Sequence, residues 1–154
     1  MSEPSMRRGV RCAAGVFLIA SGMQAVAHYH FYLNPASRGE AARELVRVLQ
    51  GYVVAPAFGT TMWTVLCMFS LAFAILLMLA GTAYWWMGRY LPAPQLRPLA
   101  TASAWLCLGG TAAMALLHPV LHAVLILLAA GLAFSYASWA GRPRAPVDGD
   151  ATSR

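Results

Sequence analysis

The stretch TMWTVLCMFSLAFAILLMLAGTAYWW, residues 61–86, decides the fold class of this chain. It contains no Asp, Glu, Lys or Arg, and an apolar run of this length predicts a helix that crosses a bilayer. Trp63 and Trp85 lie 22 residues apart. In a helix this separation is about 33 Å, close to the spacing of the aromatic belts at the two membrane surfaces. The stretch therefore predicts a helix that runs from one membrane interface to the other.

The rest of the chain shares this apolar character. Of its 154 residues, 60% are hydrophobic and only 10% are charged, which leaves too little polar surface to cover a water-soluble globule of this size. Residues 12–33 and 98–141 also lack charged side chains. The second stretch is long enough for two spans, and Pro119 fits the first turn of a new helix better than a helix interior. We therefore predict an all-α fold, a four-helix transmembrane bundle in one membrane domain over residues 9–141, with spans at about 9–33, 60–87, 98–117 and 119–140.

The segment SRGEAARELVRVLQG, residues 37–51, predicts a further, short helix. Ser37 followed by Glu40 has the pattern of a capping box. At 100° per residue, the charged residues form one stripe and the apolar residues form the opposite face. The stripe contains Glu40, Arg43, Glu44 and Arg47, and the apolar face contains Ala41, Ala42, Leu45, Val48, Leu49 and Tyr52. We expect an amphipathic interfacial helix over about residues 38–50, between the first and second spans.

The arginines predict the orientation in the membrane, because all eleven basic residues are Arg. One side of the four-span arrangement carries Arg7, Arg8, Arg11, Arg89, Arg97, Arg142 and Arg144, whereas the other carries Arg38, Arg43 and Arg47. Since cytoplasmic loops are enriched in Arg, we expect a bacterial inner-membrane protein with both termini in the cytoplasm. Residues 1–8 are then a cytoplasmic N-terminus, and residues 142–154 a disordered cytoplasmic tail. Topology and anionic headgroups explain the basic pI, so no nucleic-acid partner is expected.

The predicted spans carry few residues suited to catalysis. No carboxylate lies inside any of them, so a buried proton relay lacks its usual acid. Cys12, Cys67 and Cys107 show no CxxC spacing, and we interpret them as packing residues rather than as a disulfide framework or a zinc site. We predict no catalytic residues.

Histidines give the one pattern that favours a binding site. In the four-span arrangement, His28, His30, His118 and His122 all lie near the outer surface. Neutral imidazoles on facing helices bind transition metals or haem iron, which makes His28 with His118 or His122 a candidate haem or metal site. On a helix, His30 is about 200° from His28, so both cannot address one centre.

A structural role is the alternative for this part of the first span. Ser21, Gln24 and His28 recur on one helix face. Polar side chains in a span usually face other helices, because lipid offers no hydrogen-bond partner. Ser21 and Gln24 are then structural polar residues, and His28 faces the bundle while His30 lies at headgroup depth.

Three features follow one another along the chain. A first span ends in HYHFYLNP (residues 28–35), a second reads TTMWTVLCMFSLAFAILLMLAG (residues 60–81), and LRPLA (residues 96–100) opens the third. In this order they resemble a group of small four-helix integral membrane proteins of bacteria, over roughly residues 9–140. The resemblance implies the four-helix architecture, and it implies no activity, cofactor or site residue.

These observations predict a non-enzymatic protein of the bacterial inner membrane with a role in packing, partner binding or assembly. Its expected partners are the lipid bilayer and a membrane protein or a second copy of the chain, and we expect no cofactor. A haem- or metal-binding membrane protein is the first alternative. A small transporter or permease subunit is the second, and it needs a water-filled polar path.

Overall fold

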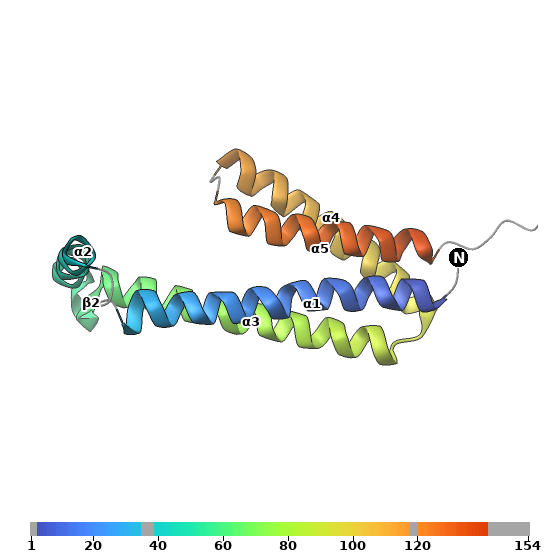
Figure 1. The fold of residues 1–154 in the computed structure, drawn as a ribbon, viewed down its shortest axis with the longest axis horizontal. Helices are drawn as coiled ribbons and strands as arrows, with labels where there is room; N and C mark the ends of the chain where they lie inside the picture. Colours follow the sequence, from blue (N-terminus) through green and yellow to red (C-terminus); the bar gives the residue numbers. More distant parts are fainter. Residues whose placement is uncertain (1–2, 35–38, 118–119, 142–154) are drawn as a thin grey trace, which may run out of the picture. The chain divides into compact units, whose positions relative to one another are not determined.

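The computed structural model describes residues 3–34, 39–117 and 120–141 (Figure 1). In chain order the elements are α1 (Glu3–His28), the π-helical turn η1 (Tyr29–Leu33), α2 (Glu40–Gly51), β1 (Val53–Ala55), the 3₁₀ turn η3 (Pro56–Phe58), β2 (Thr60–Thr61), α3 (Met62–Tyr90), α4 (Ala93–Leu117) and α5 (Leu121–Ala140). The chain divides into two compact units. We call residues 15–83 the central unit, and residues 1–14 with 84–154 the terminal unit. Helices α1 and α3 contribute to both.

The long helices follow from the apolar runs in the sequence. Within the described residues, four helices are long and apolar enough to cross a membrane, namely Glu3–Leu33, Met62–Tyr90, Ala93–Leu117 and Leu121–Ala140. Even the shortest has 20 residues, a rise of about 30 Å, which matches the hydrocarbon core of a bilayer. The helical class and the four candidate spans are therefore confirmed, and the short strands β1 and β2 are an addition to them.

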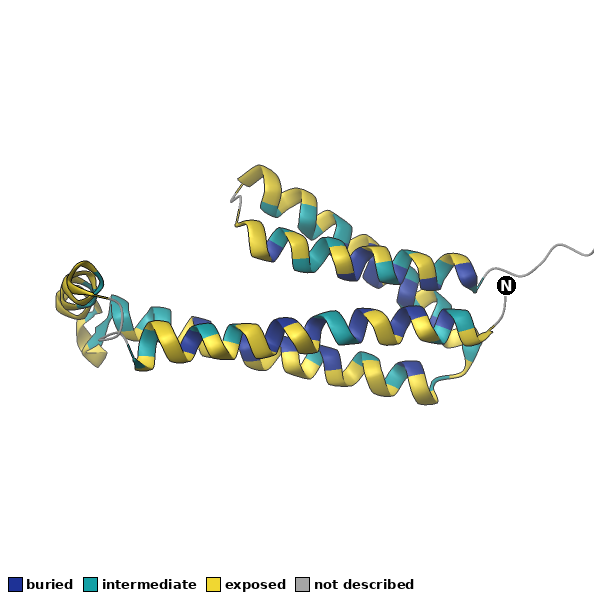
Figure 2. Cartoon of the chain, viewed as in Figure 1, coloured by how far each residue is buried: buried dark blue, intermediate teal, exposed yellow. Residues whose placement is uncertain are grey.

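Exposed residues occur along each of these helices (Figure 2), and many of them are large and apolar. Ile19 in α1 is 67% exposed, Phe69 in α3 is 71% exposed and Leu106 in α4 is 76% exposed. Continuous apolar surface of this kind is unfavourable in water, whereas lipid tails accept it. The exposure agrees with helices that contact lipid.

Helix α1 begins at Glu3, earlier than the start predicted at residue 9. Oε1 of Glu3 accepts hydrogen bonds from Nε and Nη2 of Arg7, at 2.9 and 2.7 Å. An acidic side chain four residues before a basic one, in the first turn, stabilises an exposed helix start. The apolar run alone does not contain this pairing, and for this reason the helix extends beyond the predicted span at its start.

Helix α4 also begins earlier than predicted, at Ala93, so that Pro98 lies inside the helix. The backbone N–H groups of Gln95 and Leu96 donate to the carbonyl oxygen of Pro92, at 3.0 and 3.1 Å. The first turn is therefore formed before Pro98 is reached, and the proline removes one intrahelical hydrogen bond near the helix start. The helix thus extends beyond the predicted span of residues 98–117 at its start, and both end at residue 117.

Helix α2 starts at Glu40, and its start differs from the predicted capping box. The N-cap residue is Gly39, with φ 86°, and the described residues provide no side-chain hydrogen bond to this cap. Ser37 lies outside the described residues. Glu40 is the first helical residue, whereas a capping box needs its Glu at the third. The capping box is therefore wrong, and the left-handed backbone that glycine permits precedes the helix instead.

A small hairpin that the sequence analysis did not predict joins α2 to α3. Strand β1 pairs antiparallel with β2, with Val53 opposite Thr61 and Ala55 opposite Thr60. Gly59, at φ 61°, ends the turn between the strands. The carbonyl oxygen of Tyr52 accepts the N–H of Met62 at 2.8 Å, so the end of α2 is bonded to the start of α3.

The core of the terminal unit is built from small residues that let helices approach closely, around the fully buried Phe134. A Cβ added at Gly9 in α1 would lie 2.8 Å from the Cβ of Ala137 in α5. A Cβ added at Gly131 in α5 would lie 2.9 Å from Cδ2 of Leu108 in α4. Close approach at small residues is typical of helix packing in membranes.

Candidate functional site

The polar stripe of the first span contacts α3 inside the central unit. The hydroxyl of Ser21 donates to the carbonyl oxygen of Ala74 at 2.8 Å, and Nε2 of Gln24 donates to Oγ of Ser70 at 3.1 Å. Ser21 and Ser70 are buried, and Gln24 is half-buried. The three-residue spacing of Ser21 and Gln24 places both on one face of α1. That face is joined to α3 by hydrogen bonds, which is the arrangement expected of structural polar residues.

His28 continues this stripe and is the last residue of α1 before η1. It is 9% exposed. Its ring centroid lies 5.1 Å from that of Tyr32, which in turn lies 5.2 Å from that of Trp63 in α3. Among the described residues, Nδ1 of His28 has no hydrogen-bond partner. An unpaired buried imidazole nitrogen carries a desolvation cost, and it is also an atom that ligates transition metals.

The two histidines of HYHFYLNP differ in exposure, as their angular separation predicts. His30 lies in η1 and is exposed, and its ring contacts that of Tyr29 edge to face at 5.4 Å. The N–H of Asn34 donates to the carbonyl oxygen of Tyr29 at 2.9 Å, an i to i+5 bond that closes the π-helical turn. His28 is thus buried and His30 is not.

Of the other predicted ligands, one lies outside the described residues and one lies in the other unit. His118 lies outside the described residues, and His122 is exposed in the first turn of α5, in the terminal unit. The part of the chain that the structure describes contains no group of three or more His, Cys, Asp or Glu side chains arranged to hold a metal ion. The pairing of His28 with His118 or His122 stays a prediction.

Among the free cysteines, Cys107 is buried, Cys67 is half-buried and Cys12 is exposed.

The terminal unit contains two polar pairs that the sequence analysis did not identify. The hydroxyl oxygens of Tyr84 in α3 and Ser103 in α4 lie 2.7 Å apart, and those of Thr101 in α4 and Ser138 in α5 lie 2.6 Å apart. Each pair joins two candidate spans. A lone Ser or Thr in an apolar run does not reveal its partner, since the partner is far away in the sequence.

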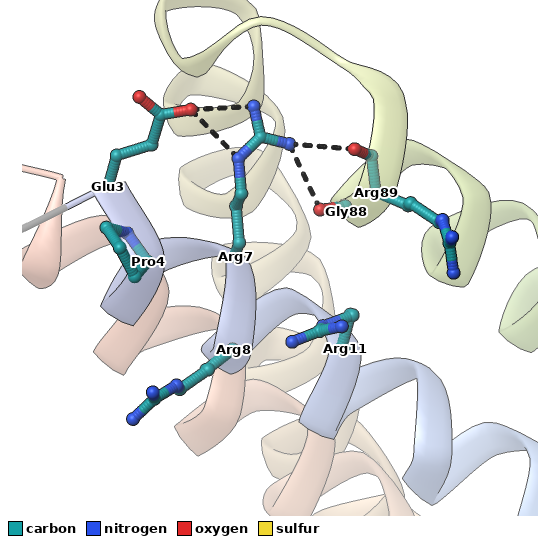
Figure 3. Close-up of a pocket in the computed structure, with 7 residues that line it drawn as sticks. All are labelled: Glu3, Pro4, Arg7, Arg8, Arg11, Gly88 and Arg89. Atoms are coloured by element: carbon teal, nitrogen blue, oxygen red, sulfur yellow. Dashed lines mark hydrogen bonds and ion pairs between the residues drawn. The ribbon is translucent and has the colours of Figure 1, made fainter.

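A second feature of the terminal unit is a cavity where α1 begins and α3 ends. It measures about 410 Å³ and is lined by Glu3, Pro4, Arg7, Arg8, Arg11, Gly88 and Arg89 (Figure 3). Nη1 of Arg7 donates to the carbonyl oxygens of Gly88 and Arg89, both at 3.2 Å. These carbonyls belong to the last turn of α3. The carbonyl groups of a helix's last turn have no hydrogen-bond donor within the helix. Arg7 thus joins the start of α1 to the end of α3.

The remaining arginines of this cavity, Arg8, Arg11 and Arg89, are exposed, and two of them lie against aromatic rings. The guanidinium carbon of Arg11 lies 5.8 Å from the ring centroid of Trp85, and that of Arg89 lies 5.6 Å from the ring centroid of Tyr90. Cation–π contacts of this kind orient a guanidinium without neutralising it. From the sequence alone, these arginines predict the orientation in the membrane and not the cavity.

The four long apolar helices and the polar contacts between them define the class, a multi-pass helical membrane protein. Comparisons with known protein families, with curated proteins and with solved structures found no match.

Proposed function

We propose that this chain is a non-enzymatic protein of the bacterial inner membrane that acts by packing against, and assembling with, membrane proteins or a second copy of itself. The observation that carries the proposal is the use of polar side chains inside the spans. Ser21 and Gln24 bond α1 to α3 in the central unit, and Thr101 bonds α4 to α5 in the terminal unit. These groups bond helices of the same chain to one another, and the proposal extends this use of polar side chains to contacts with a partner in the membrane.

The outer loop supplies a surface for this role, as an amphipathic helix at the membrane interface. None of the residues of α2 is buried. Leu45 is 59% exposed, Val48 is 58% exposed and Tyr52 is 60% exposed, and they lie on the face opposite the charged stripe. An apolar face of this kind is stable in the headgroup region of a bilayer. The arginine distribution supports cytoplasmic termini, which puts α2 on the outer side.

A haem- or transition-metal-binding protein is the second candidate, and the buried, unpaired Nδ1 of His28 favours it among the described residues. In this candidate His28 is one ligand, and His118 or His122 supplies the other. Neutral imidazole is a ligand for haem iron and for Zn, Cu and Fe ions.

One preparation separates the two candidates. The full chain is expressed with haem and transition metals supplied and purified in mild detergent, and its absorption spectrum and metal content are measured. The assembly function predicts no Soret band and less than stoichiometric metal. A Soret band or one bound metal per chain that His28→Ala removes and His30→Ala retains would overturn it in favour of the ligand-binding candidate.

Cross-linking in native membranes tests the assembly role itself. The expected result is a discrete cross-linked species of defined mass that contains this chain and a second copy or another membrane protein. A chain that remains monomeric in membranes at every cross-linker concentration contradicts the proposal.

A further inference from the structure

We propose that the cavity lined by Arg7, Arg8, Arg11 and Arg89 binds the phosphate of an anionic phospholipid headgroup. The cavity lies in the terminal unit, between the first turns of α1 and the last turn of α3 (Figure 3). A basic pocket at the end of membrane helices is a recurrent way to hold an acidic headgroup.

The charge of the cavity favours an anion. Its lining contains four arginines and one carboxylate, that of Glu3, so four minus one leaves a formal charge of +3. The carboxylate of Glu3 accepts hydrogen bonds from Nε and Nη2 of Arg7. Arg8, Arg11 and Arg89 form no ion pair with a carboxylate within the described residues. Three exposed guanidinium groups at this cavity thus have no carboxylate partner among the described residues, and the side chains of Arg8 and Arg89 point to opposite sides of it (Figure 3).

Arg7 has a different role from the other three arginines. It reduces the electrostatic repulsion between an anion and the C-terminal end of α3. The end of a helix carries partial negative charge on its last carbonyl oxygens. Arg7 donates to two of these, on Gly88 and Arg89. With these oxygens bonded, the repulsion between the end of α3 and a phosphate is reduced, and Arg7 is a positioning residue.

The depth of the cavity favours lipid over a dissolved anion. Trp85, Trp86 and Tyr90 lie at this end of α3, and amphipathic rings are enriched at the headgroup level of a bilayer. Arg11 and Arg89 lie against two of these rings. A shallow apolar hollow of about 340 Å³, lined by Trp86, Met87, Tyr90, Leu91 and Pro92, lies on the same end of α3. A phospholipid has both a phosphate for the arginines and an apolar part for this hollow, whereas inorganic phosphate has only the first.

The net charge of the headgroup decides which class of lipid the cavity prefers. Arg binds phosphate oxygens through two parallel N–H donors. Phosphatidylglycerol carries a net negative charge, whereas in phosphatidylcholine the quaternary ammonium offsets the phosphate charge. We therefore expect the cavity to prefer the anionic lipid.

The test measures lipid binding to the purified full chain in non-ionic detergent by native mass spectrometry. Short-chain phosphatidylglycerol and phosphatidylcholine are titrated in separate arms, and inorganic phosphate is added as a competitor in a third. The test variant is the double substitution Arg11→Gln with Arg89→Gln. The matched control is Arg43→Gln with Arg47→Gln, which removes two exposed arginines from α2. Far-UV circular dichroism checks that each variant keeps its helices.

The expected result is tighter binding of phosphatidylglycerol than of phosphatidylcholine. Each arginine near an anionic headgroup contributes about fivefold in affinity, so the test variant is expected to bind phosphatidylglycerol about 30-fold more weakly. The control is expected to stay within about twofold of the unaltered chain. Equal affinity for the two lipids, or an equal loss in both double variants, would overturn the proposal. Full displacement of lipid by equimolar inorganic phosphate would assign the cavity to a free anion and overturn the lipid assignment.

A second variant that conserves charge tests the proposal if the glutamine variant does not fold. Arg11→Lys with Arg89→Lys retains both charges but loses the paired donors of guanidinium. We expect this variant to bind phosphatidylglycerol more weakly than the unaltered chain and to keep its preference over phosphatidylcholine. Loss of that preference with both charges retained contradicts a site based on net charge.

Discussion

Replacement of Gly9 by alanine tests the close helix contact in the terminal unit. An added Cβ would lie 2.8 Å from Cβ of Ala137 and 3.0 Å from its Cα and N atoms. Two of these three atoms are backbone, which cannot rotate away. The helices α1 and α5 must therefore separate by several tenths of an ångström to restore ordinary contact distances. The matched control is Gly15→Ala in the same helix, where the described residues place nothing within 4 Å of an added Cβ.

The expected magnitude comes from two opposed effects. Glycine in a helix interior is less favourable than alanine by about 0.5–1 kcal/mol, and both variants gain this. Overpacking of a close contact costs about 1–3 kcal/mol, and only Gly9→Ala pays it. The propensity gain cancels in the comparison, so we expect Gly9→Ala to be less stable than Gly15→Ala by about 1–3 kcal/mol.

The assay is equilibrium unfolding in mixed micelles, with SDS as denaturant and helix content followed by circular dichroism. The free energy of unfolding is compared among the unaltered chain and the two variants. A Gly9→Ala variant as stable as Gly15→Ala would refute the contact between α1 and α5 at this residue. Larger side chains at Gly9 should increase the loss.

Three further predictions concern single positions. Ser138→Ala removes the hydroxyl bonded to Thr101 and should lower the free energy of unfolding by about 0.6 kcal/mol, and by at most about 1.7 kcal/mol; no change in SDS unfolding would contradict a stabilising contact. A single cysteine placed at the exposed Gln50, in a chain with its native cysteines replaced by alanine, should react with an impermeant thiol reagent from the periplasmic side, and reaction only from the cytoplasmic side would reverse the orientation. If the protein binds haem or a metal, His28→Ala should abolish the bound species and His30→Ala should leave it nearly intact, because His28 is buried and His30 is exposed; equal effects in the absorption spectrum would refute this assignment.

The sequence predicts the spans because each depends on composition alone. The run around residues 61–86 fixes α3 to within a few residues of its observed ends, Met62 and Tyr90. Helix starts are harder to predict, because they depend on local bonds that hydropathy does not contain. The Glu3 pair with Arg7 extends α1, and the turn at Pro92 begins α4 ahead of its apolar run.

The polar stripe was predictable in part. Three-residue spacing places Ser21 and Gln24 on one face, and the cost of an unpaired polar group in lipid requires a partner. The identity of that partner, Ser70 for Gln24, depends on the register of α1 against α3. No local pattern specifies that register. The same applies to the arginine cavity, since Arg7 and Gly88 are 81 residues apart in the chain.

The hairpin of β1 and β2 has a pattern in its own sequence, although the helical patterns on both sides make the pattern hard to recognise. Val53, Val54, Thr60 and Thr61 are β-branched and flank a turn with Pro56 and Gly59, which is a pattern typical of two short strands. The segment is short and lies between two helical patterns, so its alternation of apolar and polar residues covers only a few positions. The pairing of the strands in the structure establishes the hairpin.

A double-mutant cycle between Gln24 and Ser70 tests most directly the claim that polar groups inside the spans hold helices together. Gln24→Leu, Ser70→Ala and the double variant are unfolded in SDS mixed micelles, and the coupling free energy is compared with that of a control cycle between Gln24 and Thr64. The Thr64 hydroxyl, in the first turn of α3, is bonded to that of Thr61, the last residue of β2. We expect a favourable coupling of about 0.6–1.7 kcal/mol between Gln24 and Ser70 and none between Gln24 and Thr64. Zero coupling between Gln24 and Ser70 would contradict it.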